Sequence, residues 1–229
     1  MKKLLVLVII LGLLYGAYIT IIPGYNLYIE TLKNDPLDKK IEALREEPHY
    51  TKYSDIPKMY FNALIATEDR RYYVHNGLDL IGSGRAVYVN LKGKKLKEGG
   101  STISQQLAKN LYFPLDYTVK RKVAEILMAL KIERDYSKEE VLEIYVNCIY
   151  YGSGYTGIYE ASKGYFNKKP KDLNLNECTI LVGVPNAPSK YSPKVNMDLC
   201  LQRQAKVLRE MVKGGYITEK ERSDISKKK

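Results

Sequence analysis

An uncharged apolar run near the start of the chain restricts where the rest of it can fold. The run extends from Leu4 to Ile22 and follows the basic pair Lys2-Lys3. A helix of about 20 apolar residues is long enough to cross the hydrocarbon core of a bilayer. Because no small-x-small cleavage site follows, we expect residues 1–23 to form a retained membrane anchor rather than a removed signal peptide. A buried core helix would explain neither the terminal lysines nor the length of the run.

The charge of the chain fits an exported domain with an anionic partner. Lysines before an apolar span favour a cytoplasmic N-terminus. We therefore expect a single-pass protein of the bacterial cell membrane whose larger part is extracytoplasmic. The formal net charge of +11 suits lipid headgroups, wall polymers or a diphosphate substrate, and no nucleic acid is expected outside the membrane. The three cysteines have no metal-ligand spacing and there are only two histidines, so neither a disulfide framework nor a zinc site is expected.

The pattern after the anchor is helical almost throughout. Pro23-Gly24 is expected to end the anchor, and residues 24–53 to form a membrane-proximal stalk with one short helix at most. Apolar residues then recur at helical spacing, and no alternating run is typical of a strand. We expect an all-α domain over residues 54–216, followed by a short helix and a basic tail over residues 217–229. Capping-box patterns mark helix starts at Ser137-x-x-Glu140, Asn174-x-x-Glu177 and Thr218-x-x-Glu221.

Two adjacent acids close an apolar helix in the segment ALIATEDRRYYVHNGLD. Glu68 and Asp69 stand at the C-terminal end of this helix, where they oppose the helix macrodipole. That unfavourable placement favours a functional carboxylate, which could act as a general base. The alternative is a surface acid paired with Arg70 or Arg71. His75, in the following turn, fits a hydrogen-bonded structural residue.

The stretch GGSTISQQLAKN joins flexible backbone to a helix with many small polar residues. Gly99-Gly100 allows close backbone approach to a ligand. Unpaired N–H groups at a helix start near Ser101 favour an anion. The side chains of Gln105 and Gln106 can both donate and accept, as sugars and amides require. The alternative is a loop followed by an ordinary capped helix.

Two further helices carry polar residues at functional spacing. Glu125 lies on the flank of an apolar stripe, one turn after Arg121 and one turn before the small residue Ala129, which leaves room for a ligand. The alternative is an ordinary i,i+4 ion pair between Arg121 and Glu125. Glu143 and Asn147 share one face of the next helix, before a segment rich in tyrosine and glycine that could shape a groove for sugar or lipid.

Together these features suggest chemistry on a sugar that carries phosphate. Two separated acids, a polar cluster and the cation Lys109 lie in a domain outside a membrane. An inverting sugar transfer needs a base that deprotonates the acceptor hydroxyl. It also needs positive charge beside the departing diphosphate.

In this order, the motifs resemble those of glycosyltransferase family 51, the peptidoglycan polymerases of class A penicillin-binding proteins and of monofunctional transglycosylases. The resemblance extends from about Asp55 to Gly215. It is carried by ATEDRRYYVHNGLD, GGSTISQQLAKN, RKVAE, EIYVNCIYYGSGYTGIYEASKGYFNKKP and LVGVPNAPSKYSP. Each piece is weak evidence alone, but five in order are highly specific. The resemblance implies a lysozyme-like, mainly helical domain with a jaw region that dips toward the membrane.

The resemblance also implies residue roles. Glu68 would be the general base that deprotonates the 4-hydroxyl of an acceptor lipid II, which attacks the lipid-linked nascent glycan, forms a β-1,4 link and releases undecaprenyl diphosphate. Lys109, with Arg121 or Lys122, would neutralise the diphosphate, and Glu125 would be the second essential acid. The residues expected to line or complete the donor cleft are Ser101, Thr102, Gln105, Gln106, Asn110, Asn186 and Arg203. Supporting positions are Asp69, His75, Gly99, Gly100, Glu143 and Asn147.

The resemblance also bounds the cofactors and partners. No cofactor is required by the sequence, although Glu125 could orient a divalent cation, Mg or Mn, near the diphosphate. Expected partners are lipid II, the nascent glycan, the membrane and other cell-wall synthesis proteins. Tyr117 departs from the family, because many members carry a cleft arginine there. No S-x-x-K with K-T-G set occurs, so a monofunctional enzyme is expected. The alternatives are a lysozyme-like hydrolase, which would have no diphosphate to bind, and a non-catalytic membrane-anchored scaffold.

Overall fold

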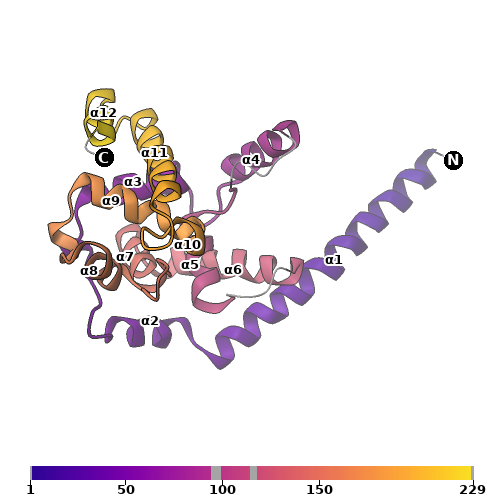
Figure 1. The fold of residues 1–229 in the computed structure, drawn as a ribbon. Coiled ribbons are helices and arrows are strands. Elements are labelled where there is room, and N and C mark those ends of the chain that lie inside the picture. Colours follow the sequence, from indigo (N-terminus) through magenta and orange to yellow (C-terminus); the bar gives the residue numbers. More distant parts are fainter. Residues whose placement is uncertain (1, 94–98, 114–117, 228–229) are drawn as a thin grey trace.

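The structure is a computed structural model, and it describes residues 2–93, 99–113 and 118–227. Over these residues the chain is helical, with no strand and one isolated bridge between Tyr150 and Thr156. The expected all-α fold is confirmed (Figure 1). The α-helices are α1 (Lys2–Asn34), α2 (Leu37–Arg45), α3 (Lys58–Glu68), α4 (Leu80–Gly93), α5 (Ile103–Tyr112), α6 (Val119–Asp135), α7 (Lys138–Cys148), α8 (Ile158–Phe166), α9 (Leu175–Gly183), α10 (Pro188–Tyr191), α11 (Met197–Lys213) and α12 (Glu219–Lys227). Short 3₁₀ helices are η1 (Tyr53–Asp55), η2 (Tyr72–Val74), η3 (Pro170–Asp172) and η4 (Val184–Asn186).

Two groups of helices share the core. In one group α5 packs on α6 and α7, and in the other α3 packs on α9 and α11. A single apolar cluster joins the two groups, and its fully buried members include Leu107, Met128 and Leu142. Full burial of each such side chain contributes roughly 1.5–3 kcal/mol to stability. The core therefore holds the end of α3 and the face of α5 in fixed positions relative to each other.

The predicted capping boxes form as expected. Ser137 and Asn174 each accept the N–H three residues later, and the glutamate at that position bonds back to the cap. Thr218 makes the same exchange with Glu221. An additional box at Thr102 starts α5, so this helix begins at Ile103, slightly later than expected. Such caps satisfy N–H groups that the helix itself leaves unpaired, which fixes where each helix begins.

The first helix does not end where the sequence suggested. We expected Pro23-Gly24 to close the anchor, but α1 continues through Pro23 to Asn34. The reason is a close helix crossing at Gly24, where a Cβ atom would lie 2.4 Å from Val123 Cβ and 2.9 Å from the carbonyl oxygen of Lys120. Only glycine allows α1 to approach α6 so closely, and the tertiary contact outweighs the weak helix propensity of Pro and Gly.

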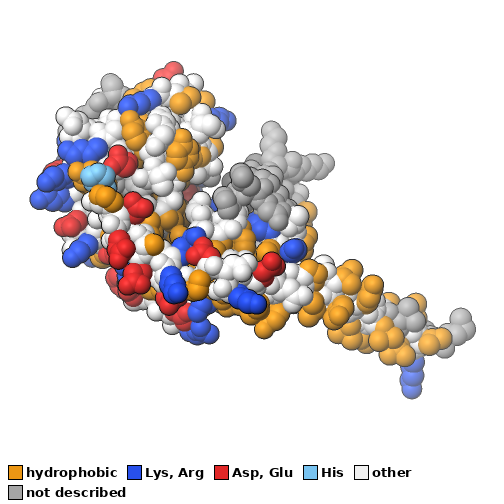
Figure 2. Space-filling view, turned by 90° about the horizontal axis from the view of Figure 1, so that it is seen from below, with side chains coloured by type: hydrophobic (Ala, Val, Ile, Leu, Met, Phe, Trp, Pro, Cys, Tyr) orange, Lys and Arg blue, Asp and Glu red, His pale blue; other side chains and the backbone are white. Residues whose placement is uncertain are grey.

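Residues 24–53 pack on the domain instead of forming a stalk. Leu27 and Leu32 of α1 pack against the core, and Leu37 and Ile41 of α2 are buried in it. The one short helix expected in this segment is α2. The first part of α1 behaves differently: it leaves the body of the molecule as a free rod (Figure 1), and apolar side chains cover its surface (Figure 2). It is long and apolar enough to cross a membrane.

Helix α4 also stands away from the body (Figure 1). The expected helix over residues 80–91 is confirmed. Leu80, Ile81, Tyr88 and Leu91 on this helix are 63–76% exposed. At its inner side Gly100 approaches Ser83 and Ala86, and the Ser83 hydroxyl donates to the carbonyl of Gly100. This contact places α4 beside the start of α5.

Candidate active site

Glu68 is the last residue of α3, and three helices meet at its carboxylate. Its Oε1 accepts from Nη2 of Arg203 on α11 at 2.9 Å. Its Oε2 accepts from Nε2 of Gln106 on α5 at 3.1 Å. The Glu68 side chain is 18% exposed and that of Arg203 is 6% exposed. The alternative of a surface acid paired with Arg70 or Arg71 is wrong, because Arg70 pairs with Glu210 and Arg71 with Asp79.

Asp69 fixes the position of Glu68. It caps the end of α3 with an extended backbone, φ −153° and ψ 74°. Its buried carboxylate accepts from Nε2 of His75 at 2.9 Å and from the N–H of Ile103, the first residue of α5, at 3.0 Å. The first N–H group of α5, which was expected to be free for an anion, is therefore taken by Asp69. The negative charge that favours a helix N-terminus is supplied there by the protein itself.

The two glutamines of the sequence motif have different positions. Gln105 is buried, and its carbonyl accepts the N–H of Thr102 in the capping box, while the Thr102 hydroxyl donates to the carbonyl of Gly77. Gln106 is the one that faces Glu68. Asn110 donates to the backbone of Gln106 one turn earlier and does not line the cleft described below.

Glu125 forms a buried ion cluster on α6. Its two carboxylate oxygens contact Arg121 and Lys122, and its side chain is 2% exposed. The i,i+4 pair between Arg121 and Glu125 is thus present, with Lys122 as a second cation. Lys122 also donates to the hydroxyl of Ser101 at 2.8 Å, which joins α6 to the start of α5. Glu125 therefore holds two cations in place at one side of Glu68.

The main cleft of the site has a volume of about 520 Å³ and connects the two acids. Among the described residues its wall carries five basic and two acidic side chains. It is lined by Thr67, Glu68, Gly99, Ser101, Gln105, Gln106, Lys109, Arg121, Lys122, Glu125, Pro185, Asn186, Arg203 and Lys206. Arg121 and Lys122 pair with Glu125, and Arg203 with Glu68, whereas no acid within the described part of the chain pairs with Lys109 or Lys206. Within the described residues, these two lysines therefore leave the cleft with positive charge to which an anion can bind.

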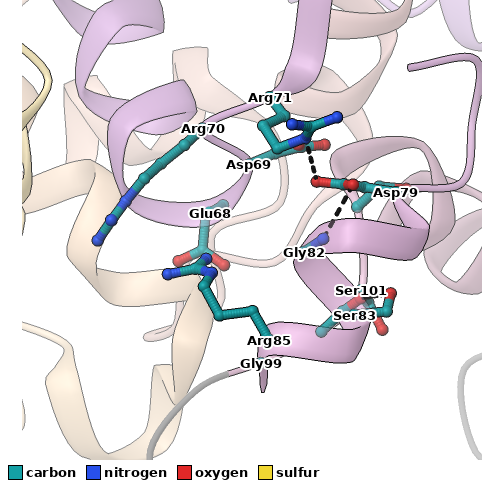
Figure 3. A pocket seen from close by; sticks show the side chains of 12 residues that line it. Glu68, Asp69, Arg70, Arg71, Asp79, Gly82, Ser83, Arg85, Gly99 and Ser101 are labelled. Carbon is teal, nitrogen blue, oxygen red and sulfur yellow. Dashed lines mark hydrogen bonds and ion pairs between the residues drawn. The ribbon is translucent and has the colours of Figure 1, made fainter. Parts of the chain in front are cut away.

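Glu68 also lines a second cleft, of about 320 Å³ (Figure 3). Arg70, Arg71 and Arg85 line it, together with Gly99 and Gly100. Nε of Arg71 lies 3.2 Å from the Asp79 carboxylate, which also accepts the N–H of Gly82 at 2.9 Å. Glu68 thus lines both clefts, so its carboxylate is within reach of molecules bound in either of them.

Most of the predicted site residues come together in this region, but some do not. Glu143 accepts from the Tyr50 hydroxyl and from the N–H of Tyr53, and Asn147 exchanges two hydrogen bonds with the backbone of Thr51. These two residues tie the segment before η1 to α7 and do not line the main cleft. The Tyr117 position lies outside the described residues.

Several cleft residues were not singled out from the sequence. Lys206 lies one turn after Arg203 on α11, so the i, i+3 spacing on one helix face could have indicated it. Arg85 comes from α4 and lines the second cleft. No sequence signal points to Arg85, because α4 is placed beside the site by a tertiary contact with Gly100.

The comparisons with known proteins agree with this geometry. Residues 36–212 match the family model described as transglycosylase. The chain is 46% identical over 168 residues to penicillin-binding protein 1F of Bacillus subtilis (strain 168) and 37% identical over 240 residues to penicillin-binding protein 1A of Aquifex aeolicus. These matches cover 73% and 95% of this chain, which spans only 24% and 32% of those two relatives.

A third relative is similar over nearly its whole length. It is the Cupriavidus necator protein named "Putative transglycosylase H16_A0665", 39% identical over 219 residues, with 96% of this chain and 91% of that protein covered. Fold and site together define a lysozyme-like helical domain with an acid set in a basic cleft. The chain belongs to the transglycosylase family.

Proposed function

We propose that this protein polymerises lipid II into β-1,4-linked glycan strands and releases undecaprenyl diphosphate. Its family gives the reaction class, which is glycosyl transfer in peptidoglycan synthesis. The observation that carries the residue assignments is the position of Glu68 at the wall of a cleft that also holds Lys109 and Lys206, two lysines with no acidic partner among the described residues. A hydrolase of finished glycan would have no diphosphate to neutralise, so this excess charge favours transfer from a lipid diphosphate.

The proposed reaction is a direct displacement. Glu68 takes the proton of the acceptor 4-hydroxyl, whose oxygen attacks the anomeric carbon of the donor sugar. The bond from that carbon to the diphosphate oxygen breaks, and the electron pair leaves with the diphosphate. Lys109, Arg121 and Lys122 stabilise the charge that develops on the leaving group. Attack opposite the leaving group inverts the anomeric centre, which accounts for the β-linked product.

The partners of Glu68 prepare it for this role. Arg203 and Gln106 donate to its two oxygens, so the site binds the ionised form that a general base requires. Glu125 acts differently in the proposal, because it touches cations of the protein and holds them in the cleft. Gln106, Asn186 and Ser101 line the wall beside them and would contact sugar or peptide groups.

The residues near Glu125 do not fit a divalent cation. Both of its oxygens contact basic side chains of the protein. Among the described residues no group of three or more His, Cys, Asp or Glu could hold a metal ion. The proposal therefore assigns stabilisation of the diphosphate to the basic side chains of the cleft.

We assign the free part of α1 to the bilayer. The lysines at its start favour a cytoplasmic N-terminus, which places the helical domain and its cleft outside the cell. This orientation agrees with a substrate whose polyprenyl chain remains in the membrane while its diphosphate lies at the surface. Other cell-wall synthesis proteins are expected to supply lipid II and to use the glycan.

The test is incubation of the full-length protein in detergent with fluorescent lipid II. We expect polymer that lysozyme digests. A matched variant, Glu139→Gln, changes an exposed acid on α7 and should polymerise like wild type. Absence of polymer from folded wild-type protein, in several detergents and with or without Mg²⁺, would reject the proposed function.

A further inference from the structure

A chain of hydrogen bonds reaches Glu68 from the buried side of the site. The hydroxyl of Tyr145 on α7 donates to Oε1 of Gln106 at 3.0 Å. Nε2 of Gln106 then donates to Oε2 of Glu68 at 3.1 Å. Tyr145 is 2% exposed and does not line the main cleft. It therefore reaches the reaction only through Gln106.

The donor and acceptor roles along this series of hydrogen bonds follow from the chemistry of each group. An ionised carboxylate only accepts hydrogen bonds, while an amide has one accepting end and one donating end. If the Gln106 amide turned over, its oxygen would face the Glu68 carboxylate and its NH₂ group would face the Tyr145 hydroxyl. The donating hydroxyl of Tyr145 opposes that rotation, because it already bonds the amide oxygen.

The Tyr145 hydroxyl retains its proton at neutral pH. Burial raises the pKa of Tyr145 well above its ordinary value of 10, and the nearby Glu68 charge raises it further. The phenol therefore remains a donor. A buried hydroxyl without a partner is costly, so the bond to Gln106 is also favoured by the stability of the fold.

We propose that Tyr145 is a positioning residue for Glu68, acting by holding the Gln106 amide in the orientation that donates to the base. This inference rests on the proposed function and deepens it. Loss of the hydroxyl frees the amide to rotate, so a fraction of the molecules presents an oxygen to Glu68. Because Tyr145 touches no substrate, the loss affects the rate of the chemical step and not substrate binding.

The experiment compares Tyr145→Phe with Tyr151→Phe. Both tyrosines are buried, and each loses only a hydroxyl; that of Tyr151 bonds the hydroxyl of Tyr60 at 2.7 Å and does not reach Glu68. We expect Tyr145→Phe to lower kcat about tenfold, the scale of one lost hydrogen bond in the transition state, with KM within about twofold. Tyr151→Phe should leave both kinetic constants within about twofold of wild type.

A double-mutant cycle separates positioning from general destabilisation. In a Gln106→Ala background, Tyr145→Phe should have no further effect on kcat, because the residue through which it acts is absent. Unchanged kcat in the single variant, or equal loss in both backgrounds, would overturn the inference. So would equal kinetic losses in Tyr145→Phe and Tyr151→Phe.

A second measurement does not depend on catalysis. In thermal unfolding of the same four proteins of the cycle in detergent, Tyr145→Phe should lower Tm in the wild-type background by clearly more than in the Gln106→Ala background. If the Tm changes of the two substitutions are additive, the interaction between Tyr145 and Gln106 is contradicted. If wild type makes no polymer but the Tm cycle shows coupling, the proposed function fails while the Tyr145–Gln106 link remains supported.

Discussion

The two acids of the cleft differ in what surrounds them. Glu68 is 18% exposed and is held by one arginine and one neutral amide. Glu125 is 2% exposed and its two oxygens each contact a cation. The first acid remains partly open to a molecule bound in the cleft, whereas the second is enclosed by its two cations. The same side-chain type therefore serves as a base at one position and as a holder of cations at the other.

The largest effect that separates the two acids is expected for Glu68→Gln. General-base catalysis contributes about 10²–10⁴-fold, so polymerisation should fall by that factor. The free energy of unfolding should fall by less than in Glu125→Gln, because only one cation, Arg203, loses its acid and a glutamine carbonyl can still accept from it. Lipid II polymerisation and thermal unfolding measure both quantities. Retained activity in this variant would remove Glu68 from the role of base.

For Glu125→Gln, the larger expected effect is on the free energy of unfolding. Removing the charge leaves Arg121 and Lys122 without their acid, and Arg121 is 11% exposed. Loss of one partner from a buried ion pair costs about 3–5 kcal/mol; we expect the lower end, since Lys122 is 38% exposed. Denaturant unfolding measures the loss. If Glu125→Gln is as stable as Glu68→Gln, the contrast between the two acids is wrong.

Lys109→Ala and Lys206→Ala test whether the uncompensated charge serves the substrate. Losing one hydrogen bond to a charged group lowers kcat/KM by about 10–100-fold. We expect the upper part of that range for Lys109 and about tenfold for Lys206. Stability should not change, because neither lysine has an ion-pair partner among the described residues. Lys220→Ala on the exposed helix α12 is the control, and an equal loss there would indicate a nonspecific charge effect.

The smallest expected effect is that of Gly24→Leu, which tests the contact between α1 and α6, the helix that carries the Glu125 ion cluster. Gly24→Leu overpacks the contact between α1 and α6, at a cost of about 1–3 kcal/mol, and should disturb α6 more than the partners of Glu68. Gly12→Leu is a matched control on the same helix, since nothing lies within 4 Å of a Cβ at that position. Thermal unfolding of the two variants measures the difference. Equal Tm values would contradict a close α1–α6 contact.

Local patterns predicted local structure well. The capping boxes at Ser137 and Asn174 begin helices as expected, because a cap is set by residues only three positions apart. Glu68 was identifiable for a similar reason, since an acid at the end of an apolar helix is unfavourable without a special partner. That partner, Arg203, lies 135 positions away and was expected only from the resemblance to a family.

Features that depend on contacts between distant segments were missed. Pro23-Gly24 is a normal helix stop by local preference, yet glycine is what allows α1 to pack against α6. The N-terminus of α5 has the pattern of an anion site, but Asp69, which precedes it by 34 positions, occupies its first N–H group. In both cases the sequence correctly indicated an unusual backbone site, but it did not indicate which distant residue contacts that site.

Under the proposed assignment of the free part of α1 to the bilayer, the continuity of this helix sets how far the cleft stands from the membrane. Its 33 residues span about 50 Å, and a bilayer core takes up about 30 Å of that length. The remainder is clamped along α6, the helix that carries Arg121, Lys122 and Glu125. In the proposed orientation no slack tether separates membrane and domain, so the cleft would be held at a constant height and its encounters with lipid-borne substrates would be a search in two dimensions.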